Sequence, residues 1–396
     1  MEYKLSEIFD LQMGKTPDRH NTAYWSDGTE PWISIADLSK CDKYIAETAE
    51  CISIDAVHGS GIKIIPENTV IMSFKLSIGK LAITPHPMYS NEAIMAFIDK
   101  GVTKINPTYL YYLLMQKDWD EGTNKAVMGK TLNKATLSKV RIRVHTPEEQ
   151  AQIVEILDKS KGVITARKTQ LSELDNLVKA RFVELFGDPM TNPLGWPVCE
   201  LSKHIRFLTS GSRGWAKYFT DTGEYFITIK NVKNCRITLD DVQHITPPDN
   251  AEAKRTRVHE GDLLISITAD LGRTGVVTKE IADHGGYINQ HLTCIRVNQS
   301  SVRPLYVAYY MESDAGKTQF RAKNQSAVKA GLNFNSINSL RLMVPPVELQ
   351  DTFIAFVEQV DKSKVVGLIN GIMNGGVSSD SRPDGIETCP SEKCTK

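Results

Sequence analysis

The sequence predicts an α+β protein in which two homologous mixed α/β domains are separated by long antiparallel coiled-coil helices. Three observations predict this fold class. Similar segments recur in the same order about 200 residues apart, both halves contain short strand-like segments rich in Val, Ile and Leu, and a stretch of about forty residues has the spacing of a coiled-coil seam. Since a domain usually has about 150 residues, the 396-residue chain has room for two such domains and their helices.

The internal repeat extends through almost the whole chain. Matching pairs keep their order, and the spacing between them drifts by only a few residues, as insertions in loops would cause. The clearest pairs are Leu5-Ser6 with Leu201-Ser202, Val70–Ser73 with Leu263–Ser266, Leu132-Asn133 with Leu332-Asn333, and Asp158–Lys161 with Asp361–Lys364. A period this long indicates a duplicated domain rather than a solenoid repeat.

Each half is predicted to contain the same elements, in domains that cover residues 1–146 and 189–345. A short apolar strand bounded by turn residues comes first, a helix then begins at a proline, and a second strand precedes the next proline. These elements are expected at Thr69–Phe74, from Pro107 and at Val140–Val144 in the first half, and at Asp262–Thr268, from Pro304 and at Leu340–Val344 in the second.

A long helix is expected after the first domain, over residues 147–188. It has Gly162 as its one internal glycine and ends at Gly187-Asp188-Pro189. Apolar residues follow one another at spacings of mainly four and three, which is typical of a coiled coil. The seam residues are Ile153, Leu157, Ile164, Leu171, Leu174, Val178 and Leu185. An ordinary amphipathic helix packed on its own domain is the alternative.

The second helix is expected over residues 346–372, with Phe353, Val357 and Val360 at the same spacing. Gly367 and Gly371 are predicted to interrupt this helix and to make it shorter than the first, and residues 373–396 are predicted to be a disordered polar tail. Because both helices leave similar domains, we expect them to pair antiparallel and to hold the domains at a set distance.

Composition excludes several classes of protein. Lys and Arg number 47 and Asp and Glu number 47, which argues against binding of nucleic acid by bulk charge but allows a local basic face. The seven cysteines are scattered and contain no C-x-x-C, so a disulfide framework or a zinc site is not expected, and a reducing cytoplasm fits. We expect neither a signal peptide nor a membrane span.

Motifs of catalysis and metal binding are missing from the sequence. Gly14–Thr16 and Gly129–Thr131 read Gly-Lys-Thr but lack the upstream glycine of a phosphate-binding loop, and Asn106–Tyr109 lacks the second proline of an adenine-methyltransferase tetrad. The nine histidines show no metal-ligand spacing, and His284 and His291 are assigned to loop and core. We therefore expect no catalytic residue, no metal site and no cofactor on this chain.

Two similar but unequal domains suit a DNA duplex with two different half-sites. Lys and Arg bind phosphates and guanine edges, whereas Asn and Gln bind adenine edges. Candidate contacts lie in loops at equivalent places of the two halves. They are Lys75, Ser77, Lys80, Asn91, Lys125, Lys130 and Thr131, and then Lys230, Asn231, Thr268, Arg273, Asn289, Gln290, Gln325, Ser326 and Lys329. Solvated loop residues without a role in binding are the alternative.

Several motifs together have the pattern of one known family. They are Leu5–Phe9 followed by Gly14-Lys15, Trp32–Ile35, Gly261–Ser266, Ala330–Asn333, Val344–Pro346 with Glu348 and Gln350, and Arg181–Pro189. With these motifs the chain resembles the specificity subunit of type I restriction–modification systems, over residues 1 to about 366. The family's second spacer is usually a long helix, so the glycine-rich stretch from Gly367 departs from its pattern.

The resemblance implies that the two domains are target recognition domains, each reading one half of a split double-stranded DNA sequence. The helices would be spacers that dock two modification subunits, which bind S-adenosylmethionine and methylate adenine. Restriction subunits would add cleavage driven by ATP and Mg²⁺. The chain itself would be a non-catalytic cytoplasmic subunit without a membrane anchor. An enzyme with its own methyltransferase or nuclease site, and a scaffold that binds proteins, stay open as alternatives.

Overall fold

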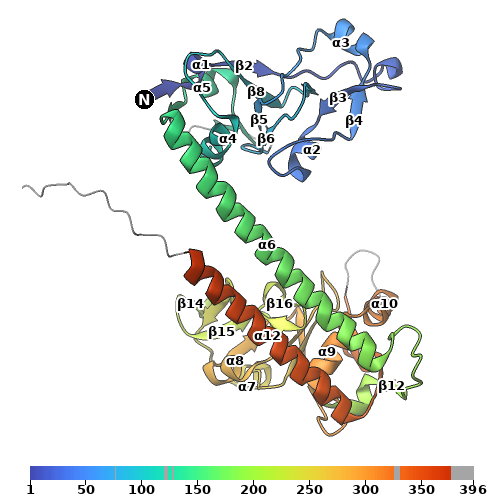
Figure 1. The fold of residues 1–396 in the computed structure, drawn as a ribbon. Coiled ribbons are helices and arrows are strands. Elements are labelled where there is room, and N and C mark those ends of the chain that lie inside the picture. The colour runs from blue at the N-terminus through green and yellow to red at the C-terminus, as the bar shows by residue number, and fades with distance from the viewer. Residues whose placement is uncertain (76, 120–123, 127–128, 325–330, 376–396) are drawn as a thin grey trace, which may run out of the picture. The chain divides into compact units, whose positions relative to one another are not determined.

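A computed structural model describes residues 1–75, 77–119, 124–126, 129–324 and 331–375 (Figure 1). The chain divides into two compact units, unit 1 at Met1–Arg167 and unit 2 from Lys168 onward. The boundary falls inside helix α6 (Pro147–Phe186). The predicted division kept this helix apart from both domains, whereas each half of the helix belongs to one unit.

Unit 1 is built around two small sheets. The four-stranded antiparallel sheet has the order β2 (Phe9–Met13), β8 (Ile94–Asp99), β5 (Val70–Ser73) and β6 (Leu81–Ile83). The three-stranded sheet has the order β4 (Glu50–Ile52), β3 (Glu30–Ile33) and β7 (Tyr89–Ser90), with β3 and β7 parallel. The other elements are β1 (Glu2–Lys4) paired with β11 (Arg141–Arg143), the hairpin β9 (Asn124–Ala126) and β10 (Gly129–Thr131), and helices α1 (Leu5–Ile8), α2 (Ile35–Lys40), α3 (Ile54–Ser60), α4 (Pro107–Met115) and α5 (Lys134–Lys139).

Unit 2 repeats this plan. Its four-stranded antiparallel sheet has the order β13 (Ile205–Ser210), β22 (Leu292–Val297), β19 (Leu263–Ser266) and β20 (Thr274–Val276). The second sheet has the order β14 (Phe219–Thr220), β18 (Gln243–Ile245), β15 (Glu224–Ile227) and β21 (Gly286–Ile288), with β15 and β21 parallel. The other elements are β12 (Val198–Glu200) paired with β23 (Arg341–Met343), β16 (Val232–Lys233) paired with β17 (Arg236–Ile237), and helices α7 (Ala251–Thr256), α8 (Lys279–His284), α9 (Pro304–Glu312), α10 (Asp314–Lys323), α11 (Phe334–Asn338) and α12 (Val347–Gly375).

The order of strands therefore confirms the duplication. The sheet β2-β8-β5-β6 has the same connectivity as β13-β22-β19-β20, and an antiparallel and a parallel partner flank β3 as they flank β15. The strands predicted around residues 70 and 263, the helices that begin at Pro107 and Pro304, and the strands before each spacer helix all form. Local apolar runs and proline positions specified these elements because both signals act over a few residues.

Helix α6 begins at Pro147, as its sequence predicts, and ends at Phe186, two residues before the predicted end of this segment. The Thr146 hydroxyl accepts from the Glu149 N–H at 3.3 Å, and the Glu149 carboxylate accepts from the Thr146 N–H at 2.8 Å, which together form a capping box. Gly187 ends the helix in a left-handed conformation, with φ of 77°, that a β-carbon would disfavour.

The seam of α6 is closed in unit 2. Val178 is buried, Leu174 and Leu185 pack against the same core, and this core also holds Phe353, Val357 and Val360 of α12. Phe182 and Phe186 are the larger buried side chains of α6, and the seam prediction missed them because it followed a register one residue away. In the unit 1 half of α6, Ile153 and Leu157 are partly buried, but Ile164 is 56% exposed and is not part of a closed seam within the described chain.

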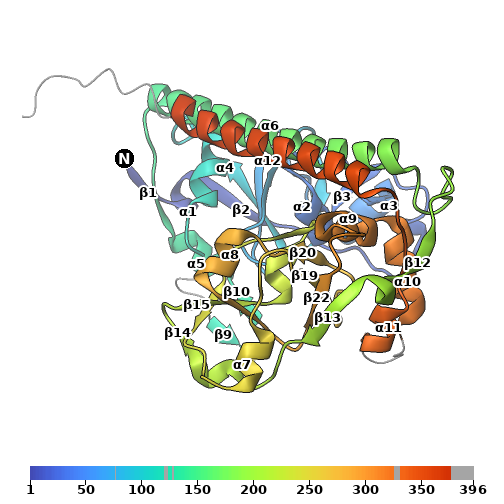
Figure 2. The same ribbon diagram turned by 90° about the horizontal axis from the view of Figure 1, so that it is seen from below.

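In unit 2, α12 runs antiparallel to the second half of α6 (Figure 2). Phe353 near the start of α12 contacts Phe182 and Phe186 near the end of α6, whereas Lys364 further along α12 pairs with Asp175 further back on α6 at 2.5 Å. The predicted interruption is wrong, because α12 continues through Gly367 and Gly371 to Gly375. Glycine lowers helix stability by roughly 1 kcal/mol per residue, which does not by itself end a helix.

The repeated Asp-Lys-Ser-Lys segment anchors each spacer helix to its own unit. In unit 1 the pairs are Lys43–Asp158 at 2.8 Å and Lys161–Asp42 at 2.5 Å, and in unit 2 they are Arg236–Asp361 and Lys364–Asp175. The same tetrapeptide therefore serves the same structural purpose twice.

Candidate nucleic-acid interface

A buried serine organises the β5–β6 turn of unit 1. The Ser73 hydroxyl donates to the Ser77 carbonyl and accepts from the Lys80 N–H at 3.0 Å, and Ser73 is fully buried. Gly79 has φ of 84°, a conformation that favours glycine. These bonds fix the described residues of the turn, among them Lys75, Ser77 and Lys80 of the predicted set.

The β19–β20 turn of unit 2 is built in the same way. The Ser266 hydroxyl donates to the Asp270 carbonyl and accepts from the Arg273 N–H at 2.9 Å. Gly272 has φ of 80°, and a β-carbon on it would lie 2.2 Å from the Phe320 ring. Both units thus hold one turn geometry with a buried hydroxyl and a left-handed glycine.

The two turns present different side chains from this common frame. In unit 1, Lys80 Nζ donates to the Ser39 hydroxyl, and Lys75 Nζ lies 5.3 Å from the Phe74 ring centre. In unit 2, Arg273 Nε donates to the Asp270 carboxylate at 2.5 Å. Two turns with the same backbone geometry but different polar side chains would suit two DNA half-sites of different sequence, because each base pair presents its own pattern of donors and acceptors.

The loop before β8 and the loop before β22 also match. The Asn91 side-chain oxygen accepts from the Ala93 N–H at 3.0 Å, and that of Asn289 accepts from the His291 N–H at 3.1 Å. Gly14 and Gly211 lie so close to these loops that a β-carbon would fall 2.2 Å and 2.1 Å from the carbonyl oxygens of Asn91 and Asn289, respectively. The side-chain oxygen of each asparagine therefore stabilises its own loop.

In unit 2 a histidine joins two of the predicted residues. His291 Nδ1 lies 2.7 Å from the Thr268 hydroxyl, and its Nε2 lies 2.9 Å from the Gln290 amide nitrogen. Thr268 and Gln290 are thus brought together through a partly exposed His291, which sequence reasoning assigned to loop and core. A histidine between two polar loops leaves no periodic signal in the sequence.

In unit 1 a charged set occupies the equivalent place. The Thr16 hydroxyl donates to the Glu92 carboxylate, which lowers the pKa of Glu92, and the positive charges of Lys75 and Arg19 act in the same direction. The Arg19 guanidinium lies 3.6 Å from the Trp25 ring centre and pairs with Glu50 at 2.6 Å. Sequence reasoning missed Arg19, which lies in no recognisable motif, and it passed over Glu92 although this residue directly follows Asn91 in a repeated segment.

A further predicted segment of unit 1 is a hairpin beside the β5–β6 turn. Lys130 of β10 is the register partner of Lys125 of β9, and Thr131 is that of Asn124. The N–H of Leu132, the residue after the hairpin, donates to the Phe74 carbonyl at 3.0 Å. The strand that contains Lys130 and Thr131 therefore ends at a backbone contact with the residue before Lys75.

The corresponding segment of unit 2 is only partly described. Leu332 N–H donates to the Ile267 carbonyl at 2.9 Å, and Gly331 forms a bridge with Thr268. Gln325, Ser326 and Lys329 lie outside the described residues. Their neighbours nevertheless reach the β19–β20 turn as the hairpin reaches the β5–β6 turn.

Asn231 is removed from the candidate set, whereas Lys230 beside it is exposed. Asn231 is 2% exposed, accepts from the Thr228 N–H at 3.0 Å, and donates to the carbonyls of Thr238 and Asp240 at 3.2 and 3.3 Å. Its side chain completes a capping box with Thr228, which explains its burial. The T-x-x-N spacing was the signal for this role.

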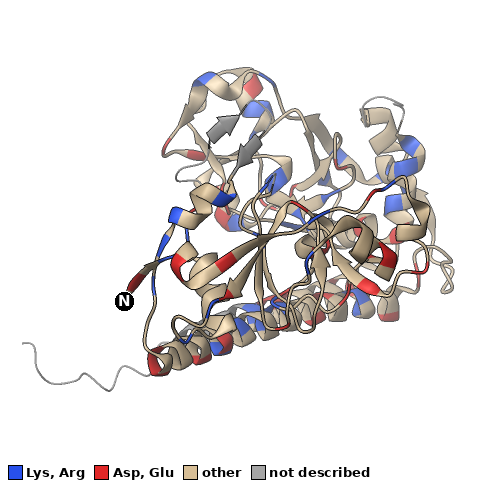
Figure 3. Cartoon of the chain, turned by 90° about the horizontal axis from the view of Figure 1, so that it is seen from above, with Lys and Arg blue, Asp and Glu red and all other residues tan. Residues whose placement is uncertain are grey.

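Charges of both signs are interspersed along helix α6 (Figure 3).

Among residues 1–75, 77–119, 124–126, 129–324 and 331–375, no helix is long and apolar enough to cross a membrane. In the same described parts of the chain, His, Cys, Asp and Glu side chains form no group of three that could hold a metal ion.

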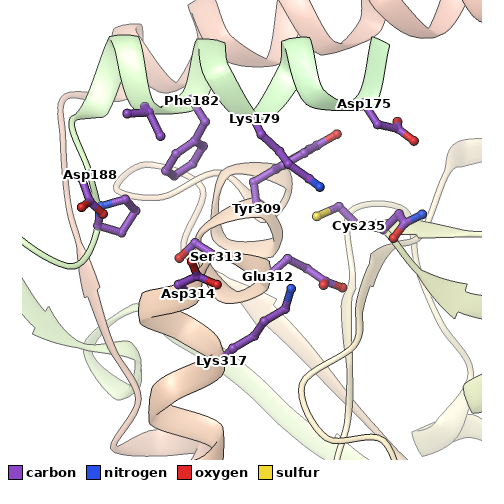
Figure 4. A pocket seen from close by; sticks show the side chains of 13 residues that line it. Asp175, Lys179, Phe182, Asp188, Cys235, Tyr309, Glu312, Ser313, Asp314 and Lys317 are labelled. Atoms are coloured by element: carbon purple, nitrogen blue, oxygen red, sulfur yellow. The ribbon is translucent and has the colours of Figure 1, made fainter. Parts of the chain in front are cut away.

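A cavity of about 410 Å³ lies beside α6 in unit 2 (Figure 4). Phe182 and Tyr309 supply apolar walls, Lys179 and Lys317 reach its edge, and Val183 of α6, which lines it, is 49% exposed. The cavity therefore lies against helix α6. Its lining includes none of the predicted DNA-contact residues.

Comparison with known proteins identifies the family. The family model described as the type I restriction modification DNA specificity domain matches residues 1–176 and 204–374. The MjaIX type I restriction enzyme specificity subunit of Methanocaldococcus jannaschii is 29% identical over 251 residues, which cover 58% of this chain and 57% of that protein. The EcoprrI type I restriction enzyme specificity subunit of Escherichia coli is 22% identical over 376 residues, which cover 90% of this chain and 86% of that protein.

Solved structures share the fold. The type I restriction–modification S subunit from M. genitalium is 12% identical, with a TM-score of 0.52 over 94% of this chain and 92% of that one. A chain from a study of complex assembly and conformational transition of the type I restriction–modification system is 15% identical, with a TM-score of 0.53 over 95% and 93%. Since this family model matches residues 1–176 and 204–374, the chain belongs to the type I restriction–modification DNA specificity family, and its role is that of a DNA-sequence specificity subunit.

Proposed function

We propose that the chain reads a two-part, asymmetric double-stranded DNA sequence, with unit 1 reading one half and unit 2 the other. The observation that carries this proposal is the pair of equivalent turns, each built on a buried serine and a left-handed glycine but bearing different side chains. In each unit a second loop comes next to this turn through one backbone hydrogen bond. Grouped Lys, Arg, Thr and Asn side chains supply donors for phosphates and base edges.

The test is a map of methylated adenines in cells that express this chain with the modification subunits of its own system. We expect methylation at one sequence with two specified halves. Arg273→Ala should lower the base specificity, or the binding affinity, for the half of the DNA sequence that unit 2 reads. The reason is that a good contact to a base contributes roughly 1–3 kcal/mol of discrimination. Lys279→Ala, an exposed charge on α8, is the matched control and should leave the sequence unchanged. Indifference to base changes in both halves contradicts the proposal.

We further propose that the chain has no reaction centre and works in the cytoplasm with two modification subunits and with restriction subunits. S-adenosylmethionine, ATP and Mg²⁺ would then bind to those partners. Exposed apolar side chains on α6 support docking on this helix: Ile156 is 64% and Val163 is 55% exposed in unit 1, and Leu177 and Val183 are each 49% exposed in unit 2. Apolar side chains on one helix are typical of a protein interface.

Substitution at one of these exposed apolar positions tests the docking. Val183→Glu should weaken association with a modification subunit at least about tenfold, because it places an unpaired charge in an apolar contact. Glu173→Gln, at another exposed position of α6, is the control. Analytical ultracentrifugation of the mixed subunits measures both, and equal association of the two variants contradicts docking at Val183.

A further inference from the structure

A thiol, an imidazole and a hydroxyl lie in series in unit 2. Cys199 Sγ lies 3.0 Å from Nε2 of His204, and Nδ1 of His204 lies 2.8 Å from the Ser301 hydroxyl. The Ser301 hydroxyl donates its proton to the Asn298 carbonyl at 3.0 Å, so it accepts from Nδ1–H. His204 therefore presents an unprotonated Nε2 to the Cys199 thiol.

This arrangement has the parts of an activated sulfur nucleophile, namely a nucleophile, a base, and a third group that orients the base. Burial lowers the pKa of His204, and the charge of Lys203 acts in the same direction. Both effects favour the neutral imidazole, whose Nε2 is the acceptor that faces the thiol. Cys199, His204 and Ser301 are all partly exposed, which gives small reagents access to the thiol.

The fold does not need these residues, because unit 1 uses others at the same places. β1 pairs with β11 as β12 pairs with β23, and in this register Tyr3 corresponds to Cys199. Ile8 corresponds to His204, since the carbonyl of each accepts from the residue that follows the last strand of the four-stranded sheet. Ile8 is fully buried, so an apolar side chain satisfies the scaffold at this position.

We propose that Cys199 is a nucleophilic thiol that peroxide oxidises to a sulfenic acid. Sγ attacks one oxygen of hydrogen peroxide, and an S–O bond forms as the O–O bond breaks. The thiol proton passes to Nε2 of His204 and then to the leaving hydroxide, which departs as water. Sulfur is oxidised by two electrons, and peroxide is reduced by the same two electrons.

The thiol is remote from the candidate DNA contacts of its unit. His204 directly precedes β13, whose start pairs with the end of β22 at Val297, whereas the β19–β20 turn lies at the opposite end of this sheet, where Ser266 pairs with Leu292. Oxidation of Cys199 is therefore expected to leave the DNA sequence that is read unchanged. The proposal does not depend on the proposed function.

Alkylation of the full chain tests the activation. Iodoacetamide is added at pH 7, and mass spectrometry follows each cysteine peptide separately, with Cys51 as the partly exposed control thiol. Cys199 should react at least about tenfold faster than Cys51, a threshold set below the roughly 100-fold that is the lower end of general-base assistance. Its rate should also change less than that of Cys51 between about pH 6 and pH 9.

Two variants separate activation from mere exposure. His204→Ile installs the residue of unit 1 and should lower the Cys199 rate to that of Cys51, with folding checked by circular dichroism. Ser301→Ala keeps the imidazole but removes its orienting hydroxyl, and it should lower the rate without a loss of fold. With peroxide followed by dimedone, the sulfenic acid adduct should form on Cys199 before Cys51. Equal reactivity of Cys199 and Cys51, or no response of the Cys199 rate to either variant, overturns the proposal.

Discussion

Gln150 and Gln350 occupy equivalent places at the start of the two spacer helices, where they are 1% and 0% exposed. The Gln350 oxygen accepts from the Arg303 N–H at 2.8 Å, and its nitrogen donates to the carbonyls of Ser301 and Pro345 at 3.2 and 2.9 Å. Gln150 makes the equivalent bonds in unit 1. One side-chain amide thus connects the first turn of each spacer helix to the loop that precedes α4 in unit 1 or α9 in unit 2.

Gln350→Leu should lower the free energy of unfolding by roughly 2–4 kcal/mol, because it leaves one buried N–H and two buried carbonyls without this partner. Urea unfolding of the full chain measures the change. Gln359→Leu, at an exposed position of the same helix, should change stability by no more than about 0.5 kcal/mol. Equal effects of the two variants contradict the role assigned to Gln350.

At the scale of the element, the pairing of α6 with α12 depends on aromatic side chains. Phe182 is 4% exposed, stacks on Tyr306 with ring centres 5.6 Å apart, and meets Phe353 edge to face at 5.3 Å. Phe182→Ala should cost about 3–5 kcal/mol, whereas the neighbouring Val183→Ala, at a half-exposed position, should cost less than about 1 kcal/mol. Thermal unfolding compares the two, and similar melting temperatures would rule out this seam register.

The anchor of α6 on unit 1 should weaken in acid. Burial acts to raise the pKa of Asp158, but hydrogen bonds from Lys43 at 2.8 Å and from Tyr112 at 2.5 Å outweigh it and lower this pKa below the ordinary value of 3.8. A lowered folded-state pKa contributes stability above the unfolded-state pKa, and this contribution disappears as the pH falls through the folded-state pKa.

Asp158→Asn should therefore destabilise the chain at pH 7, and this effect should begin to decline below about pH 4 and disappear as the pH falls through the folded-state pKa of Asp158. Because the Asp158 side chain is 40% exposed, the effect at pH 7 should stay near 1 kcal/mol. Urea midpoints of both proteins at several pH values give the difference. Asp221→Asn, at an exposed position of unit 2 remote from this anchor in the sequence, is the control with little effect at any pH. A difference at pH 3 as large as that at pH 7 contradicts the assignment.

At the scale of the whole molecule, each unit has hydrophobic cores of its own. The core in which α6 packs against α12 belongs to unit 2. Replacing residues 1–146 by the matching domain of a relative should therefore change one half of the recognised DNA sequence and leave the other half as it is. Mapping of methylated adenines with the partner subunits present measures both halves. A change in both halves contradicts independent reading by the two units.

The sequence by itself determined the duplication, the positions of most strands and helices, and the bounds of α6. These features depend on apolar periodicity, prolines and caps, which act between residues close in the chain. The same local signals were insufficient at Asn231, whose side chain has a capping role, and at Gly367, where a weak helix former lies within a helix that continues.

Only the tertiary structure decided which face of α6 is buried and which polar groups meet. Phe182 is buried because Tyr306 and Phe353 reach it from elements more than a hundred residues away, and no local pattern contains that contact. Likewise, the Cys199 thiol meets His204 nearby in sequence, but Ser301, which sets the histidine tautomer, lies 97 residues further along the chain. Contacts of this kind arise from packing of whole elements, so they follow from the fold and not from any single segment.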